Sequence, residues 1–141
     1  MSVEVGVVGA GAWGTALAQM LSGDGREVLL WAREPELVRQ INETQRNGLF
    51  LPSAQLNASI RATDDLAEMG RVPVLLLVTP AQHLARVLGG IGRHGGDVVL
   101  CSKGIEAGSG RLMADVARDA APEASLAVLS GPTFAHEVAA G

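Results

Sequence analysis

The sequence predicts an α/β fold with a doubly wound, mainly parallel sheet and helices on both faces. Short apolar, β-branched runs alternate about six times with segments of helical periodicity, which is typical of parallel sheets. The run Val72–Thr79 is apolar almost throughout, as expected of a central strand that is covered on both faces. A glycine-rich turn follows the first apolar run. No internal repeat, low-complexity tract or linker interrupts the pattern, so we expect one domain over residues 1–141.

The first half of the chain supplies the first three predicted strands. The valine-rich run Val3–Val8 predicts the first strand. A helix is expected over Ala12–Ser22, because Gly23 and Gly25 would end it. The elements expected next are a strand at Glu27–Ala32, a helix at Glu36–Arg46 with Pro35 at its start, a loop at Asn47–Asn57 and a strand at Ile60–Thr63.

The second half continues the alternation. Thr63 or Asp64 is expected to cap a short helix over Asp65–Met69. Pro80 ends the central strand, and the glycine-rich stretch GGIGRHGG is expected to follow a helix over Gln82–Leu88. The remaining expected elements are a strand at Asp97–Ser102, a helix at Arg111–Ala121, a strand at Ser125–Leu129 and a last helix that begins at Thr133 or Phe134.

Composition limits the class of protein. Hydrophobic residues make up 48% of the chain and aromatic residues only 3%, so the core should be aliphatic. The formal charge is −4 without any basic run, which argues against nucleic acid as a partner. No apolar stretch reaches the ~20 residues of a membrane span, and no signal peptide opens the chain. The single Cys101 fits a cytoplasmic protein and is expected to pack as a small hydrophobic residue.

Gly9, Gly11 and Gly14 have GxGxxG spacing between the first strand and the first helix. Gly9 permits a tight turn, Gly11 lets a pyrophosphate approach the backbone, and Gly14 lets the helix pack closely on the sheet. Free N–H groups and the positive end of the helix dipole would then face the phosphates. The pattern indicates a Rossmann-type dinucleotide-binding domain. The alternative is an ordinary glycine turn in another α/β protein.

The end of the second strand is where such domains meet the adenosine ribose of the cofactor. Arg33 stands there, followed by Glu34. An arginine that faces the ribose favours the 2′-phosphate of NADPH over NADH, whereas the alternative is a solvated arginine. In the later loop, the apolar run Leu49–Leu51 would either line the cofactor cleft or pin the loop to the core.

Lys103 follows the carboxyl end of a predicted strand, where ligands bind in open α/β sheets. Its charge could hold a phosphate or polarise a carbonyl, and a surface lysine is the alternative. The segment Ser130–Thr133 offers hydroxyl and N–H groups suited to an anion, but is also a common loop composition. His83 and His94 are expected to face solvent, and His136 is a weaker candidate for a site. No residues have metal-ligand spacing, so we expect no metal site.

Six segments of the sequence are distinctive in combination: GAGAWGTALA, WARE, NGLFLP, VTPAQ, SKGIE and LSGPTFAHEVAAG. In this order they closely resemble the bacterial NAD(P)-dependent glycerol-3-phosphate dehydrogenase family, and they span the chain from end to end. GxGxxG is shared by many families, whereas SKGIE together with SGPTFA is far more specific. The resemblance implies reduction of dihydroxyacetone phosphate to sn-glycerol 3-phosphate with NADPH, or NADH, for phospholipid synthesis in the cytoplasm.

The resemblance also implies roles for individual residues. Ala12 and Trp13 match positions that contact the pyrophosphate region; the family more often has serine at the first, so only backbone N–H contacts are expected there. Lys103 matches a lysine that touches both cofactor and substrate. The other matches are Arg33 at the cofactor-selecting position, Phe50 at an aromatic position of the cofactor loop, Gly131 and Thr133 at substrate contacts and Ala135 at a cofactor contact.

The sequence departs from the family at its end. The family has a second, helical domain that supplies the general acid/base lysine and most of the contacts with the substrate phosphate. This domain is not in the chain. Because the new alkoxide needs a proton donor within hydrogen-bond reach, we expect the chain to bind NADPH without turnover. No catalytic residue is therefore assigned here. A homodimer is one assembly that we consider for the full-length protein.

Three alternatives stay open at this level. A ketopantoate reductase or a 2-hydroxy-acid reductase is the rival within the same broad superfamily, although SKG and SGPTFA speak against it. A stand-alone nucleotide-binding or sensor module is the rival from a different class. The third is a glycine-rich α/β domain without any ligand.

Overall fold

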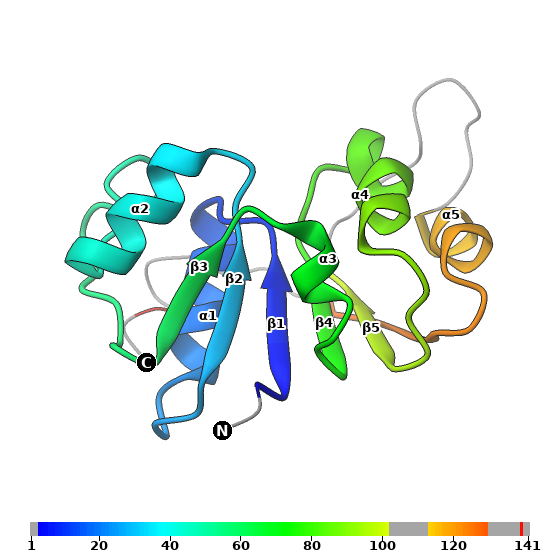
Figure 1. Ribbon diagram of the computed structural model, residues 1–141, viewed down its shortest axis with the longest axis horizontal. Coiled ribbons are helices and arrows are strands. Elements are labelled where there is room, and N and C mark those ends of the chain that lie inside the picture. The colour runs from blue at the N-terminus through cyan, green and yellow to red at the C-terminus, as the bar shows by residue number, and fades with distance from the viewer. Residues whose placement is uncertain (1–2, 102–112, 130–138, 140–141) are drawn as a thin grey trace.

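The computed structural model describes residues 3–101, 113–129 and 139, and it confirms the predicted α/β fold (Figure 1). Six parallel strands form one sheet in the order β3-β2-β1-β4-β5-β6. Each predicted strand is present, although most are shorter than expected. The strands are β1 Val5–Val8, β2 Val28–Trp31, β3 Ile60–Thr63, β4 Val74–Leu77, β5 Asp97–Leu100 and β6 Ser125–Val128.

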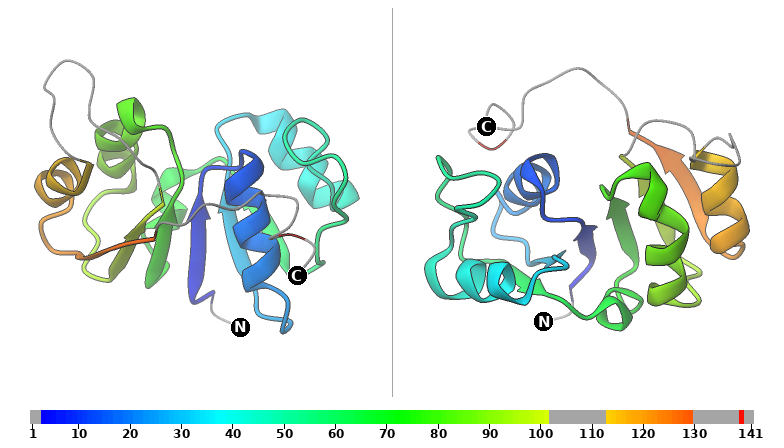
Figure 2. Two further views of the ribbon diagram at one scale, coloured as in Figure 1. Left: turned by 180° about the vertical axis from the view of Figure 1, so that it is seen from behind. Right: turned by 90° about the horizontal axis from the view of Figure 1, so that it is seen from above.

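Helices cover both faces of the sheet, and each face has its own apolar core. One core joins the sheet to α1 and α2, and the other joins it to α3, α4 and α5. Seen from behind, α1 lies against the sheet over β1 and β2 (Figure 2). The helices are α1 Ala12–Leu21, α2 Pro35–Thr44, α3 Leu66–Met69, α4 Leu84–Ile91 and α5 Met113–Ala120, and the 3₁₀ turn η1 is Ala81–His83.

The strand order creates a crevice beside β1. The chain runs outward from β1 to β2 and β3, then crosses to β4 on the other side. Val8 pairs with Trp31 of β2 and with Leu77 of β4, so the loops after these three strands begin at the same edge. The connections after β1 and β4 lead to opposite faces, which opens the space between them.

The helix after β4 differs from its prediction. A helix was expected over Gln82–Leu88. The structure instead has the 3₁₀ turn η1 followed by α4, and α4 continues through two glycines to Ile91. Burial of Ile91, which is 5% exposed, stabilises the added turn. Gly90 fits there because a Cβ would lie 2.6 Å from Leu66 Cδ1, and Gly92 ends the helix with a φ of 85°.

The structure also differs from the prediction at two other helix boundaries. Asp65, rather than Thr63 or Asp64, caps α3, because its side chain accepts a hydrogen bond of 3.0 Å from the Ala67 N–H. Helix α2 ends at Thr44 instead of Arg46, because Gln45 adopts the left-handed conformation with a φ of 56°.

His94 is buried, so the prediction that it faces solvent was wrong. The segment after α4 folds back along the start of β4, and His94 Nε2 lies 2.7 Å from the Val72 carbonyl oxygen. A carbonyl only accepts, so Nε2 carries the hydrogen. The contact lies at the amino end of β4, away from the crevice.

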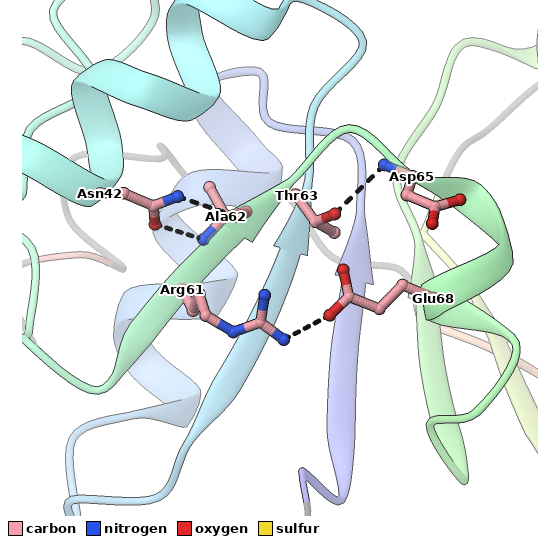
Figure 3. A network of polar contacts seen from close by, with 6 residues as sticks. All are labelled: Asn42, Arg61, Ala62, Thr63, Asp65 and Glu68. Carbon is pink, nitrogen blue, oxygen red and sulfur yellow. Dashed lines mark hydrogen bonds and ion pairs between the residues drawn. The ribbon is translucent and has the colours of Figure 1, made fainter.

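A polar network holds the edge strand β3 (Figure 3). Asn42 of α2 donates to the Ala62 carbonyl at 3.0 Å and accepts from the Ala62 N–H at 2.8 Å, which satisfies backbone groups that an edge strand would leave open. Arg61 donates to Glu68 of α3. The Arg61 guanidinium, with a smaller effect of the Thr63 hydroxyl, holds the pKa of Glu68 below its ordinary value. These contacts join α2, β3 and α3.

Candidate functional site

A cavity of about 330 Å³ lies at the carboxyl ends of β1, β2 and β4. Its walls are the glycine turn after β1, the end of β2, Phe50 from the loop after α2, and the segment from β4 into α4. Open α/β sheets bind ligands at this kind of position, where neighbouring connections turn to opposite faces. The structure thus brings Gly9, Gly11, Arg33 and Phe50, which were predicted from sequence, to one cavity.

The glycine turn has the geometry expected of its spacing. Gly9 has a φ of 122°, and its N–H donates to the Trp31 carbonyl at 3.0 Å. A Cβ on Gly14 would lie 1.8 Å from the Gly9 carbonyl oxygen, so the helix packs on the turn with no space for a side chain. A Cβ on Gly11 would meet nothing within 4 Å. The backbone is therefore open to a ligand at Gly11.

The amino terminus of α1 follows directly. Gly11 is the N-cap, no side chain caps the helix, and its first turn has no acidic residue. Thr15 N–H donates to the Gly11 carbonyl at 3.0 Å, so the N–H groups of the three residues before it have no acceptor within the helix. These residues are Ala12, Trp13 and Gly14, which lie beside the cavity rather than in its wall. Such a terminus attracts anions.

The end of β2 contributes one side wall. Arg33 is well exposed, and its Nε lies 3.7 Å from Glu34 Oε1. Trp31 is 8% exposed, and its buried Nε1 has no hydrogen-bond partner within the described part of the chain. This wall therefore offers a cation and a carboxylate to a ligand, whereas the indole N–H stays buried beneath it.

Asn47 ties the loop of Phe50 to the glycine turn, a role that sequence reasoning missed. Its buried Nδ2 donates to the Ala10 carbonyl and to Thr15 Oγ1, each at 2.8 Å. Its Oδ1 accepts from the Phe50 N–H at 3.0 Å. Leu51 is buried while Phe50 is 41% exposed and lines the cavity, so the loop does both things that were expected as alternatives.

The wall opposite β2 comes from the start of α4 and was also missed. His83 is half-buried, which leaves part of it exposed to solvent as predicted, but it also lines the cavity, which was not predicted. Arg86 lines the cavity as well, and its Nη2 lies 3.0 Å from His83 Nδ1. Both residues follow the carboxyl end of β4 at i, i+3 spacing, a signal that the strand-end rule could have found.

Cys101 packs as predicted. It lies just beyond β5, is 8% exposed and belongs to the core beneath α1 and α2. Burial raises the pKa of its thiol to about 11, so the thiol stays protonated near neutral pH. Cys101 therefore has no nucleophilic role at this site.

Several predicted residues lie outside the described residues. These are Lys103, Ser130, Gly131, Thr133, Ala135 and His136, together with the last predicted helix apart from Ala139. Within the described ranges, no group of three or more His, Cys, Asp or Glu side chains could hold a metal ion. No described helix is long and apolar enough to cross a membrane.

A family model described as the NAD-dependent glycerol-3-phosphate dehydrogenase N-terminus matches residues 4–141. The chain belongs to this family. Membership confirms the resemblance seen in the sequence and decides against a ketopantoate or 2-hydroxy-acid reductase. The glycine turn, Arg33 and Phe50 thus line a cavity in a glycerol-3-phosphate dehydrogenase N-terminal domain.

Individual members of the glycerol-3-phosphate dehydrogenase family agree. The NAD(P)⁺ enzyme of Novosphingobium aromaticivorans is 84% identical over 141 residues, which are 100% of this chain and 43% of that protein. The Erythrobacter litoralis enzyme is 55% identical with the same coverage of both chains. The crystal structure of the Coxiella burnetii glycerol-3-phosphate dehydrogenase has a TM-score of 0.87 and 31% identity over 99% of this chain and 44% of that chain. The chain therefore spans less than half the length of these relatives.

Proposed function

We propose that the cavity binds a nicotinamide dinucleotide and that the chain is the cofactor-binding part of an enzyme that reduces dihydroxyacetone phosphate to sn-glycerol 3-phosphate. The open space at Gly11, next to the uncapped start of α1, supports this most directly. A pyrophosphate at that point would accept hydrogen bonds from the free N–H groups of the first turn. The proposed reaction is supported by the two similar proteins described above, which are both named as NAD(P)⁺ glycerol-3-phosphate dehydrogenases.

The described residues suit the parts of such a cofactor. When bound, the nicotinamide supplies the hydride, while the chain binds and orients the cofactor. We assign the pyrophosphate to Gly9, Gly11, Ala12, Trp13 and Gly14, through backbone N–H groups and close approach. We assign the adenosine end to Arg33 and Phe50. No metal is needed in this assignment.

Further contacts are proposed from the family resemblance alone. Lys103 would touch both the cofactor and the substrate, and Ala135 would contact the cofactor. Gly131 and Thr133 would contact the substrate. The general acid/base lysine and most of the substrate-phosphate contacts would come from a second, helical domain, so residues 1–141 would form the dinucleotide-binding domain of a two-domain enzyme.

We further propose that the cofactor is NADPH rather than NADH. Arg33 follows β2 by two residues and lines the cavity, where a guanidinium attracts the 2′-phosphate. Glu34 beside it would accept from unphosphorylated ribose hydroxyls and so opposes the preference. In the cell, the product would enter glycerophospholipid synthesis in the cytoplasm, and the full-length protein would form a homodimer.

Titration of the 141-residue chain with NADPH and NADH tests the assignment. We expect Arg33→Ala to weaken NADPH binding by about tenfold and NADH binding by much less, because only NADPH loses a charge-assisted contact. Arg39→Ala is the matched control, since Arg39 is exposed on α2 and does not line the cavity. Failure to bind either cofactor would contradict the proposed function. Binding with a preference for NADH would contradict only the role of Arg33.

A further inference from the structure

The cavity has a second cationic wall that faces the β2 wall. Arg33 and Glu34 stand at the end of β2, whereas His83 and Arg86 stand at the start of α4. The two walls come from neighbours of β1 on opposite sides, so they flank the space beyond its carboxyl end. A ligand group between them would meet arginines from both directions.

The two arginines differ in how their charges are compensated. Arg33 lies near the Glu34 carboxylate, with 3.7 Å between Nε and Oε1. Arg86 forms no ion pair with any carboxylate of the described ranges, and its Nη2 lies 3.0 Å from Nδ1 of the His83 ring. The Arg86 charge is therefore the less neutralised of the two in the cavity wall.

The contact with His83 also determines which nitrogen of the imidazole carries the hydrogen. A guanidinium has only donors, so His83 Nδ1 must accept and the neutral ring must carry its hydrogen on Nε2. One Nη2 hydrogen is used in this way, and the other guanidinium donors stay available. His83 thus orients Arg86 without cancelling its charge.

We propose that Arg86 is a second specificity-determining residue, which binds the ribose 2′-phosphate of NADPH from the α4 side while His83 positions it. The inference rests on the dinucleotide site proposed above. In that site the ribose would lie at the end of β2, where an arginine accommodates a 2′-phosphate. Arg86 lines the same cavity as Arg33. A phosphate monoester carries up to two negative charges near neutral pH, and Arg33 is already close to a carboxylate. Arg86 supplies the missing positive charge.

Arg86→Gln in the 141-residue chain tests the proposal, with dissociation constants measured for NADPH and NADH. NADPH binding should weaken about tenfold or more, whereas NADH binding should change less than about twofold, because both ligands share the pyrophosphate. Arg86 is exposed, so its replacement should leave the thermal midpoint unchanged. Arg39→Gln removes the same charge outside the cavity and should change neither constant.

A second variant tests the positioning role of His83. His83→Ala should lower the ratio of NADPH to NADH affinity, because Arg86 loses its orienting contact; a merely structural role would lower both affinities together. The proposal is overturned if Arg86→Gln weakens both cofactors equally or weakens neither, even though the unmodified chain binds them. If the unmodified chain binds neither cofactor, the proposed function itself fails and this inference fails with it.

Discussion

At the scale of single residues, the backbone of the turn requires glycine at two of its three glycine positions but not at the third. Gly9 needs a positive φ, and Gly14 has no space for a side chain, because a Cβ would lie 1.8 Å from the Gly9 carbonyl oxygen. Gly11 has an ordinary φ of −70° and open space in front of it. The fold therefore requires Gly9 and Gly14, whereas it leaves open space at Gly11, to which we assign the pyrophosphate.

A pair of alanine variants tests this division. Gly14→Ala should lower the free energy of unfolding by about 1–3 kcal/mol or more, since α1 must move off the turn. Gly11→Ala should leave the thermal midpoint nearly unchanged but weaken NADPH binding by about tenfold, since its methyl group enters the phosphate space. Calorimetry and cofactor titration on both variants measure the two effects. A stable Gly14→Ala variant with normal affinity would contradict the division.

At the scale of elements, the loop after α2 belongs to the site because one side chain holds it there. Asn47 connects Ala10 and Thr15 of the turn and helix to the Phe50 backbone. The loop of Phe50 is therefore held at the cavity by a buried amide. Asn42, on α2, likewise holds the edge strand β3 through two hydrogen bonds to the Ala62 backbone, away from the cavity (Figure 3).

These two asparagines form a matched test. Asn47→Ala should lower the free energy of unfolding by about 2 kcal/mol or more, because buried polar groups lose their partners. It should also weaken NADPH binding by about tenfold, because Phe50 and the glycine turn lose their common anchor. Asn42→Ala should reduce stability but leave the affinity unchanged. An equal loss of affinity in both variants would show that Asn47 acts through stability alone.

At the scale of the whole molecule, the described elements build a cavity at the carboxyl ends of β1, β2 and β4, to which we assign the dinucleotide. Two arginines and several apolar residues line the cavity, and the free N–H groups at the start of α1 lie beside it. Reduction of a ketone also needs a positioned proton donor near the new alkoxide. The proposed second domain would supply that donor, which separates cofactor binding from turnover.

Steady-state assays test this separation. We expect the 141-residue chain to bind NADPH but to oxidise it with dihydroxyacetone phosphate at least about a hundredfold more slowly than the full-length Novosphingobium aromaticivorans enzyme, because general acid–base catalysis is lost. Cofactor titration of the same sample provides the control for folding. Turnover close to that of the full-length enzyme would place the proton donor within these residues.

Sequence alone determined the fold class, because the signals for it are local. Periodicity located the strands, and GxGxxG after Val3–Val8 located the first crossover, with the predicted tight turn at Gly9 and close helix packing at Gly14. The distinctive segments identified the family. Helix ends were less well predicted, as with α4, because buried contacts such as those of Ile91 extend a helix past glycines.

Only the tertiary structure decided which distant residues share the cavity. His83 looked like a surface residue, and Asn47 looked like the start of an ordinary loop. Strand order places β2 and β4 on either side of β1, which brings Arg33 and Arg86 into opposite walls of the same cavity although they are 53 positions apart in the sequence. Local propensity carries no information about such neighbours, because their proximity depends on how all the strands pair and on which face each helix packs.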